Sequence, residues 1–221
     1  MIAVIGDMIK SRSISDRYRT QQVLQEELHR INLRYQASLA SKFTVTLGDE
    51  FQGLIKNSHG LLRLLDEISF ALLPIRFRFG IGIGTLNTEI DPTTSLGADG
   101  PAYWKAREAI DFVHKYNDYG RANVHLMAAN HHESIGLINE ILKLTAFQMS
   151  GWRDSQLEVY RRILSEGILD PDSIKHREMA EQMGISPSAL TRRFESSGIK
   201  RYMLSRVEAE AAIERINELY E

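Results

Sequence analysis

The spacing of apolar residues changes along the chain, and this change constrains the fold more than any other feature of the sequence. Up to about residue 127 there are runs in which apolar and polar residues alternate, the pattern of a half-buried strand. From about residue 145 apolar residues instead recur every three or four positions, as on one face of a helix. The sequence therefore predicts two domains, residues 1–140 with strands and helices and residues 141–221 with helices alone.

The front domain is predicted to contain a sheet. Strands are expected at 2–6, 42–47, 51–55, 75–86 and 122–127, and helices at 16–35, 61–68 and 101–116. Gly48 and Asp49 form a tight turn between the second and third strands, and Gly80 and Gly82 are expected to bend the fourth strand or admit another backbone. The order β-α-β-β-α-β is that of a ferredoxin-like split βαβ sheet. We therefore predict an α+β fold, with a ferredoxin-like domain followed by an all-helical one.

Composition and charge narrow the class of protein. The chain of 221 residues is 43% hydrophobic, which allows a buried core, and it has no cysteine, which excludes disulfides and thiolate metal sites. No apolar run approaches the roughly 20 residues that span a bilayer, and residues 1–7 indicate a first strand instead of a signal peptide. These features favour a cytoplasmic protein without a membrane partner. The net charge of −2 gives no overall preference for nucleic acid.

A motif in the rear domain, residues 177–194, fits a helix-turn-helix at each constrained position. Ala180 is small where the second helix must approach closely. Gly184 lies where the turn needs a positive φ, which glycine adopts without penalty. Ser186 is a good N-cap and Pro187 suits the first helical position of the second helix. The pattern predicts a domain that binds double-stranded DNA; the alternative is a helical hairpin that does not touch DNA.

Basic residues gather after this motif and predict how DNA would be contacted. The segment 187–206 has many more basic than acidic residues, and Arg206 is among the basic ones. Such a local basic patch can neutralise the phosphates of DNA even when the protein as a whole is close to neutral. We expect base edges to meet Ser188, Ala189 and Arg192, with Thr191 on or near the same face, and phosphates to meet Arg193, Lys200 and Arg201.

The last predicted helix, 201–219, carries a seam of residues at alternating spacings of four and three. Its members are Tyr202, Arg206, Ala209, Ile213, Ile216 and Tyr220. This face either packs on the helix-turn-helix of the same chain or forms the seam of a homodimer, which would suit a palindromic DNA site.

Acidic residues of the front domain are predicted to meet at one edge of its sheet. Asp7 ends the first strand, and Asp49 and Glu50 lie at the tip of the hairpin. Because carboxylates placed together repel, such a group suits a divalent cation, Mg²⁺ or Mn²⁺. The alternative is that these acids only polarise turns.

Further residues could bind the phosphates of a nucleotide beside these acids. Ser11 and Arg12 follow Asp7 in a loop that could contact a polyphosphate. The loop Asp99–Gly100 leads into a helix that carries Arg107. We therefore expect a nucleotide site made by Ser11, Arg12, Asp99, Gly100 and Arg107.

These segments resemble known families. An acid after the first strand, a Gly-Asp hairpin, a Gly-Ile-Gly strand and a helix arginine are similar to class III nucleotide cyclases and GGDEF domains, which share a palm-type sheet. More closely, Ile-Gly-Asp-x-x-x-Ser-Arg, Leu-Gly-Asp-Glu-Phe-Gln-Gly and Asp-Gly-Pro-Ala-x-x-x-Ala-Arg resemble the SatD family of bacterial proteins over essentially the whole chain. The resemblance implies that Asp7 and Asp49 bind metal and that Arg107 stabilises a transferring phosphoryl group.

Two departures from the enzyme patterns weigh against catalysis. Tyr103 stands where the cyclases have an asparagine, four residues before the arginine. Leu47 stands where GGDEF enzymes have the first of two glycines. No catalytic residue is assigned, except Arg107 if the protein is an enzyme.

Three functions remain as hypotheses. The first is a transcriptional regulator whose front domain binds a nucleotide with a divalent metal and biases DNA binding. The second is a nucleotide cyclase or nucleotidyltransferase that uses Asp7 and Asp49 with Mg²⁺. The third is a protein-interaction module with a degenerate site.

Overall fold

The computed structural model describes residues 1–116 and 118–220, and over these residues the protein has an α+β fold. The strands are β1 (Ile2–Met8), β2 (Leu39–Leu47), β3 (Glu50–Ile55), β4 (Phe77–Ile83) and β5 (Val124–Ala128). The helices are α1 (Arg17–Arg34), α2 (Leu61–Ala71), α3 (Pro101–Lys115), α4 (Ser134–Ser150), α5 (Asp154–Ser165), α6 (His176–Gln182), α7 (Pro187–Ser197) and α8 (Ile199–Asn217). Short 3-10 turns lie at Ser11–Ser13, Pro171–Ser173 and Glu218–Tyr220.

The five strands of this sheet lie in the order β2-β3-β1-β4-β5. Strand β1 is antiparallel to both of its neighbours, β3 and β4, whereas β4 and β5 run parallel. The hairpin turns at Gly48, whose φ of 63° is of the kind that glycine adopts without strain. In this register Asp7 lies opposite Glu50 on one side and opposite Arg78 on the other. The topology therefore brings three charged positions to one end of the sheet.

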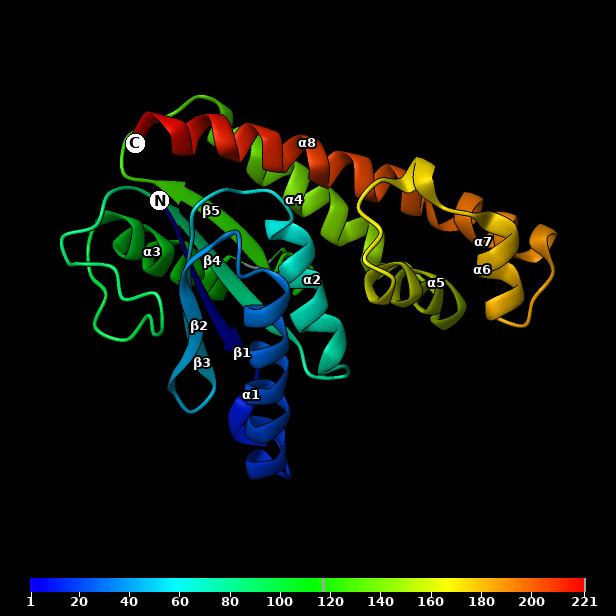
Figure 1. Ribbon diagram of the computed structural model, residues 1–221, viewed down its shortest axis with the longest axis horizontal. Coiled ribbons are helices and arrows are strands. Elements are labelled where there is room, and N and C mark those ends of the chain that lie inside the picture. The colour runs from blue at the N-terminus through cyan, green and yellow to red at the C-terminus, as the bar shows by residue number, and fades with distance from the viewer. Residues whose placement is uncertain (117, 221) are drawn as a thin grey trace.

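Helices cover both faces of the sheet, with α1 and α2 on one face and α3 on the other (Figure 1). The glycines of β4 explain the close fit of α3. A Cβ atom added to Gly80 would collide with the backbone of Ala106, and one added to Gly82 with the backbone of Ala102. The expectation that these glycines admit another backbone is confirmed.

The C-terminal helices are joined to the sheet through a shared core. Figure 1 shows α4 and α8 running side by side from the sheet to the group formed by α5, α6 and α7. The core that covers the sheet includes Ile138 and Leu142 of α4 and Ala209 and Ile213 of α8. The predicted boundary between residues 140 and 141 therefore falls inside α4, and the rear helices share part of the core of the front domain.

The seam predicted on the last helix is buried within the chain. Tyr202 packs against Tyr160 of α5 and against Trp152, which lies between α4 and α5, while Ala209, Ile213 and Ile216 pack against the sheet side. This face is used by the chain's own core, so it is not a free seam for a second copy. None of the described helices combines the length and the apolar character that crossing a membrane requires.

Candidate functional site

The charged cluster at the end of the sheet consists of two arginine–carboxylate pairs. Arg78 donates from Nε and Nη2 to the two carboxylate oxygens of Asp7, at 2.9 and 3.1 Å. Arg107 of α3 donates from Nη1 and Nη2 to the two oxygens of Glu50, at 2.6 and 2.7 Å. The hydroxyl of Thr46 also donates to Glu50, at 3.1 Å. Both acids therefore have bidentate partners, the strongest form of such a pair.

The electrostatics show that these groups interact as one cluster. Burial raises the pKa of Asp7, Arg78 opposes that effect, and the charges of Asp49 and Glu50 raise it further. In contrast, the hydrogen bonds from Arg107 hold the pKa of Glu50 below its usual value. The pKa of Arg107 is raised in turn, chiefly by Glu50. Asp7, Glu50 and Arg107 therefore lie at the same end of the sheet, and the charge of Asp49 acts on Asp7.

The cluster as folded does not fit a divalent cation. Mg²⁺ needs carboxylate oxygens with open positions, but the oxygens of Asp7 and Glu50 are taken by arginine donors. Asp49 instead lines a narrow crevice with Ser11 and Arg17, beside α1. Within residues 1–116 and 118–220, no group of three or more His, Asp or Glu side chains could hold a metal ion.

The predicted loop at Asp99–Gly100 lies away from this cluster. A Cβ added to Gly100 would meet Leu86 and Asn87, which follow the C-terminal end of β4. Asp7 lies beside the opposite end of β4, where Arg78 is. The carboxylate of Asp99 accepts a hydrogen bond from Trp104 Nε1 at 2.7 Å. The side chain of Arg12, also predicted to bind phosphate, lies outside the described part of the chain.

Sequence reasoning missed Arg78 and Thr46 as members of this cluster. In the sequence, Arg78 is a polar residue between Phe77 and Phe79, in a strand where polar and apolar residues alternate. Its role depends on the register that places it beside Asp7, and no local pattern specifies that register. The sequence does hold one signal for Arg78. It is spaced by two residues from Gly80 and Gly82, which places it on the same face of β4 as these glycines.

A second candidate site is the helix pair α6 and α7. Gly184 has a φ of 65° in the turn between them. The hydroxyl of Ser186 accepts a hydrogen bond from the backbone N–H of Ala189 at 3.2 Å, and Pro187 occupies the first turn of α7. Ala180 and Leu190 are fully buried between the helices. The local geometry of each of these residues is the one that the motif predicts.

The outer face of α7 is polar and accessible. Ser188, Thr191 and Arg192 are exposed, and Ala189 is half-buried beside them. Arg201, at the start of α8, is exposed as well. These side chains place hydrogen-bond donors and acceptors at the surface of α7 and at the start of α8.

The other basic residues of this region are engaged within the chain. Arg193 pairs with Glu158 at 3.1 Å, and Lys200 lies 3.4 Å from the exposed Asp172. Arg206 does not belong to the surface patch in which its sequence context placed it. It is buried and pairs with Asp66 of α2 at 2.9 Å, because the seam of α8 that carries it packs inside the molecule.

The fold and the two sites define an α+β protein in which a five-stranded sheet carries a charged cluster and the C-terminal helices carry an exposed helix pair. The model of the SatD family matches residues 1–213, and the chain therefore belongs to the SatD family. No curated protein and no solved structure shows significant similarity to it.

Proposed function

We propose that this protein is a DNA-binding transcriptional regulator that inserts α7 into the major groove. The observation that carries the proposal is the pair α6–α7, with its glycine turn, its capped second helix and the exposed polar face of that helix. In helix-turn-helix proteins the N-terminal residues of the second helix read base edges. Ser188, Ala189, Thr191 and Arg192 occupy that part of α7.

Phosphate contacts are assigned by the same geometry. Arg201 is exposed, and the partner of Lys200, Asp172, is itself largely exposed, so both cations can turn to a DNA backbone. Arg193 is held by Glu158 and by the carbonyl of Ser155, so its contribution requires that pair to open. We therefore rank Lys200 and Arg201 above Arg193 as phosphate contacts.

The test is DNA affinity, measured by fluorescence anisotropy with duplexes selected from a random pool. Arg192→Ala should weaken binding to the selected duplex by about 1–3 kcal/mol and relax the preference at one base pair. Arg201→Ala should weaken all duplexes alike and lower the salt slope by about 1. The matched control is Arg215→Ala, an exposed arginine near the opposite end of α8. Binding that is independent of salt and unchanged in the first two variants would contradict the proposal.

A second candidate function is nucleotide binding at the charged cluster, in a sheet of the ferredoxin-like, palm-type class. The order and directions of β2, β3, β1 and β4 support that assignment, with β5 as an addition. The convergence of Asp7, Asp49, Glu50 and Arg107 supports a site there, since Arg107 presents two donors that a phosphate could take over from Glu50. Such a ligand would act as the effector of DNA binding.

Calorimetry with the four ribonucleoside triphosphates tests this second function, with and without Mg²⁺. Wild type should bind at least one of them, and Arg107→Ala should abolish the heat. Exposed Arg121→Ala is the control. If wild type binds none of them in either condition, nucleotide binding at the cluster is contradicted, while the proposal of DNA binding is unaffected.

The structure adds no support for catalysis. Tyr103, which replaces the cyclase asparagine, is buried in the core between α3 and the sheet. Its hydroxyl has no hydrogen-bond partner among the described residues. Burial raises its pKa, so the phenol stays protonated, and its burial keeps it from contact with a ligand at the surface.

A further inference from the structure

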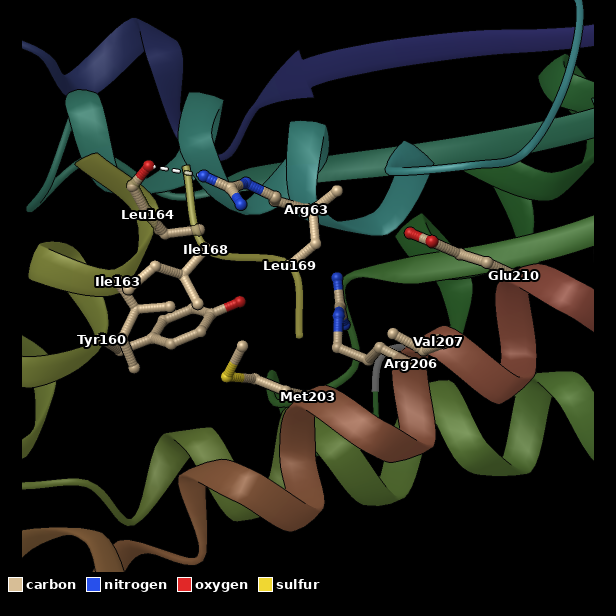
Figure 2. Close-up of a pocket in the computed structure, with 10 residues that line it drawn as sticks. All are labelled: Arg63, Tyr160, Ile163, Leu164, Ile168, Leu169, Met203, Arg206, Val207 and Glu210. Atoms are coloured by element: carbon tan, nitrogen blue, oxygen red, sulfur yellow. Dashed lines mark hydrogen bonds between the residues drawn. The ribbon is translucent and has the colours of Figure 1, made fainter. Parts of the chain in front are cut away.

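Two of the spaces between the sheet and the C-terminal helices differ in what they could hold. The smaller lies between α2, α5 and α8, where Figure 2 shows Tyr160 and Met203 on its wall, and has a volume of about 40 Å³. The larger has a volume of about 380 Å³ and lies between α2, the start of β4, α4 and α5. A water needs about 10–15 Å³ of such space, whereas a cavity of about 150 Å³ can hold benzene. The larger space, which we call the junction pocket, therefore has room for a small organic molecule.

Much of the wall of the junction pocket is apolar. Phe70 of α2 and Trp152, which follows α4, line it and are otherwise buried. Leu157 of α5 and Leu73, which follows α2, extend this wall, and Leu73 is 43% exposed. Because water gains little from contact with such a surface, the wall suits the hydrocarbon part of a ligand.

The charged residues that line the junction pocket are basic. Arg76, just before β4, is exposed, and its Nη2 donates to the carbonyl of Gly120. Its other side-chain N–H groups donate to no residue within 1–116 and 118–220. The guanidinium of Arg121 lies over the ring of Phe147, 5.0 Å from its centroid. No Asp or Glu is among the described residues that line the pocket, so its charge favours an anionic ligand.

We propose that the junction pocket binds a small organic carboxylate, with its hydrocarbon part against Phe70 and Trp152 and its carboxylate at Arg76. A guanidinium binds a carboxylate through charge-assisted hydrogen bonds, and Arg76 has N–H groups left for them. An inorganic anion would leave the apolar wall in contact with water, and a neutral hydrocarbon would gain nothing from the cation. The residues Asp7, Glu50 and Arg107 do not line this pocket, so it is distinct from the charged cluster. The proposal does not depend on DNA binding.

The position of the junction pocket brings its ligand next to residues that hold the end of α7. Trp152 donates from Nε1 to the carbonyl of Ser197, the last residue of α7, at 2.8 Å. Gln148 of α4 donates to the same carbonyl and to that of Gly198, at 2.9 and 2.8 Å. A ligand packed against Trp152 therefore stabilises the present arrangement of α4 and α7.

Tryptophan fluorescence of the full chain tests the site in the variant Trp104→Phe, which keeps Trp152 as its single tryptophan. The probes are hydrocinnamate, a phenyl ring on a short chain that ends in a carboxylate, and the neutral hydrocinnamyl alcohol, at the same ionic strength. Hydrocinnamate should change the emission saturably, and the alcohol should bind about three- to tenfold more weakly, because it lacks the charge that pairs with Arg76. Equal affinities of the two probes, or no saturable change with either, overturns the proposal.

Substitution of Arg76 separates the charge from the apolar wall. In the Trp104→Phe background, Arg76→Gln should lower the affinity for hydrocinnamate to about that of the alcohol and leave the affinity for the alcohol unchanged. Arg19→Gln, at an exposed position of α1 outside the pocket, should leave both affinities unchanged. An affinity for hydrocinnamate that is the same with and without Arg76→Gln contradicts the assigned contact.

A second measurement keeps the test decisive if Arg76→Gln does not fold. A wild-type crystal soaked with para-bromohydrocinnamate should show anomalous density for bromine beside Phe70 and Trp152, with the carboxylate at Arg76. Bromine density only outside the junction pocket, or none at all, overturns the proposal.

Discussion

Asp66 is the residue on which the contact between the two halves depends most. Its carboxylate is fully buried and accepts hydrogen bonds from Arg206, Tyr160 and Tyr202. These partners come from α8 and α5, whereas Asp66 belongs to α2. A carboxylate with this set of partners ties three helices together and compensates the buried charge of Arg206.

Removal of that carboxylate should be strongly destabilising. Asp66→Ala leaves Arg206 buried without its counter-charge and two hydroxyls without their acceptor, so the free energy of unfolding should fall by about 3–5 kcal/mol. Urea unfolding followed by circular dichroism measures the change. Asp172→Ala, which breaks an exposed pair with Lys200, should change it by less than about 0.5 kcal/mol. A small effect of Asp66→Ala would mean that the network contributes little to stability.

His125 of β5 should make stability fall as the solution becomes acidic. Burial, with a smaller effect of Lys143, lowers the pKa of His125 to about 4, and its ring stacks on Phe112 with centroids 4.2 Å apart. The unfolded chain takes up a proton near pH 6.5, whereas the folded protein does so only near pH 4. The stabilisation by the neutral ring is therefore complete above pH 6.5 and is lost progressively between pH 6.5 and 4.

Urea unfolding at pH 7 and pH 4.5 measures this loss. Between pH 7 and pH 4.5 the free energy of unfolding should fall by about 1–3 kcal/mol more in wild type than in His125→Gln. His29→Gln, at an exposed position of α1, should keep the full decrease. Identical pH dependence in wild type and His125→Gln would show that the acid sensitivity arises elsewhere.

At the scale of elements, close contact between α3 and β4 depends on glycine. Gly82→Ala should lower the free energy of unfolding by about 1–3 kcal/mol or more, because the new methyl group meets backbone atoms of Ala102 and Ala106 that cannot rotate away. Gly136→Ala is the matched control, since a Cβ at this position of α4 meets open space. That variant should be neutral or more stable by up to about 1 kcal/mol. Chemical denaturation of both variants measures the difference, and an equal response would contradict close packing at Gly82.

Elements that depend on local signals were predictable from the sequence. The second helix of the motif, expected to begin at Pro187, is α7 (Pro187–Ser197), because a cap, a proline and a glycine turn fix its start. The turn of the β2–β3 hairpin and the alternation of side chains along β4 were likewise local patterns. The pairing of elements was less accessible, because contacts such as Arg78–Asp7 and Arg206–Asp66 join positions far apart in the chain. Arg206 was therefore assigned to a surface patch, although the apolar seam that it interrupts is buried.

At the scale of the whole molecule, the two halves are continuous through α4 and α8. Residues of α8 complete the core over the sheet at one end of the helix and pack with α5 and α7 at the other. Glu210 in the middle of α8 accepts the first free N–H groups of α2, where the helix dipole favours a negative charge. The two proposed sites are connected through the pair α4 and α8. Coupling between the two proposed sites requires that this pair has two arrangements of different ligand affinity.

The shared core predicts that the halves unfold together, and the two tryptophans can report on this separately. Trp152 is buried among Tyr160 and Tyr202 of the helical half, and Trp104 is half-exposed on α3, beside the sheet. In Trp104→Phe, fluorescence follows the helical half, and in Trp152→Phe it follows the sheet half. Within each variant the fluorescence and far-ultraviolet circular dichroism transitions should have the same urea midpoint, because separation of the halves would expose the apolar residues of α8 and break the Asp66–Arg206 pair. Midpoints that differ between fluorescence and circular dichroism would show that the helices carrying α7 unfold independently, and a nucleotide at the sheet could then influence DNA binding only weakly.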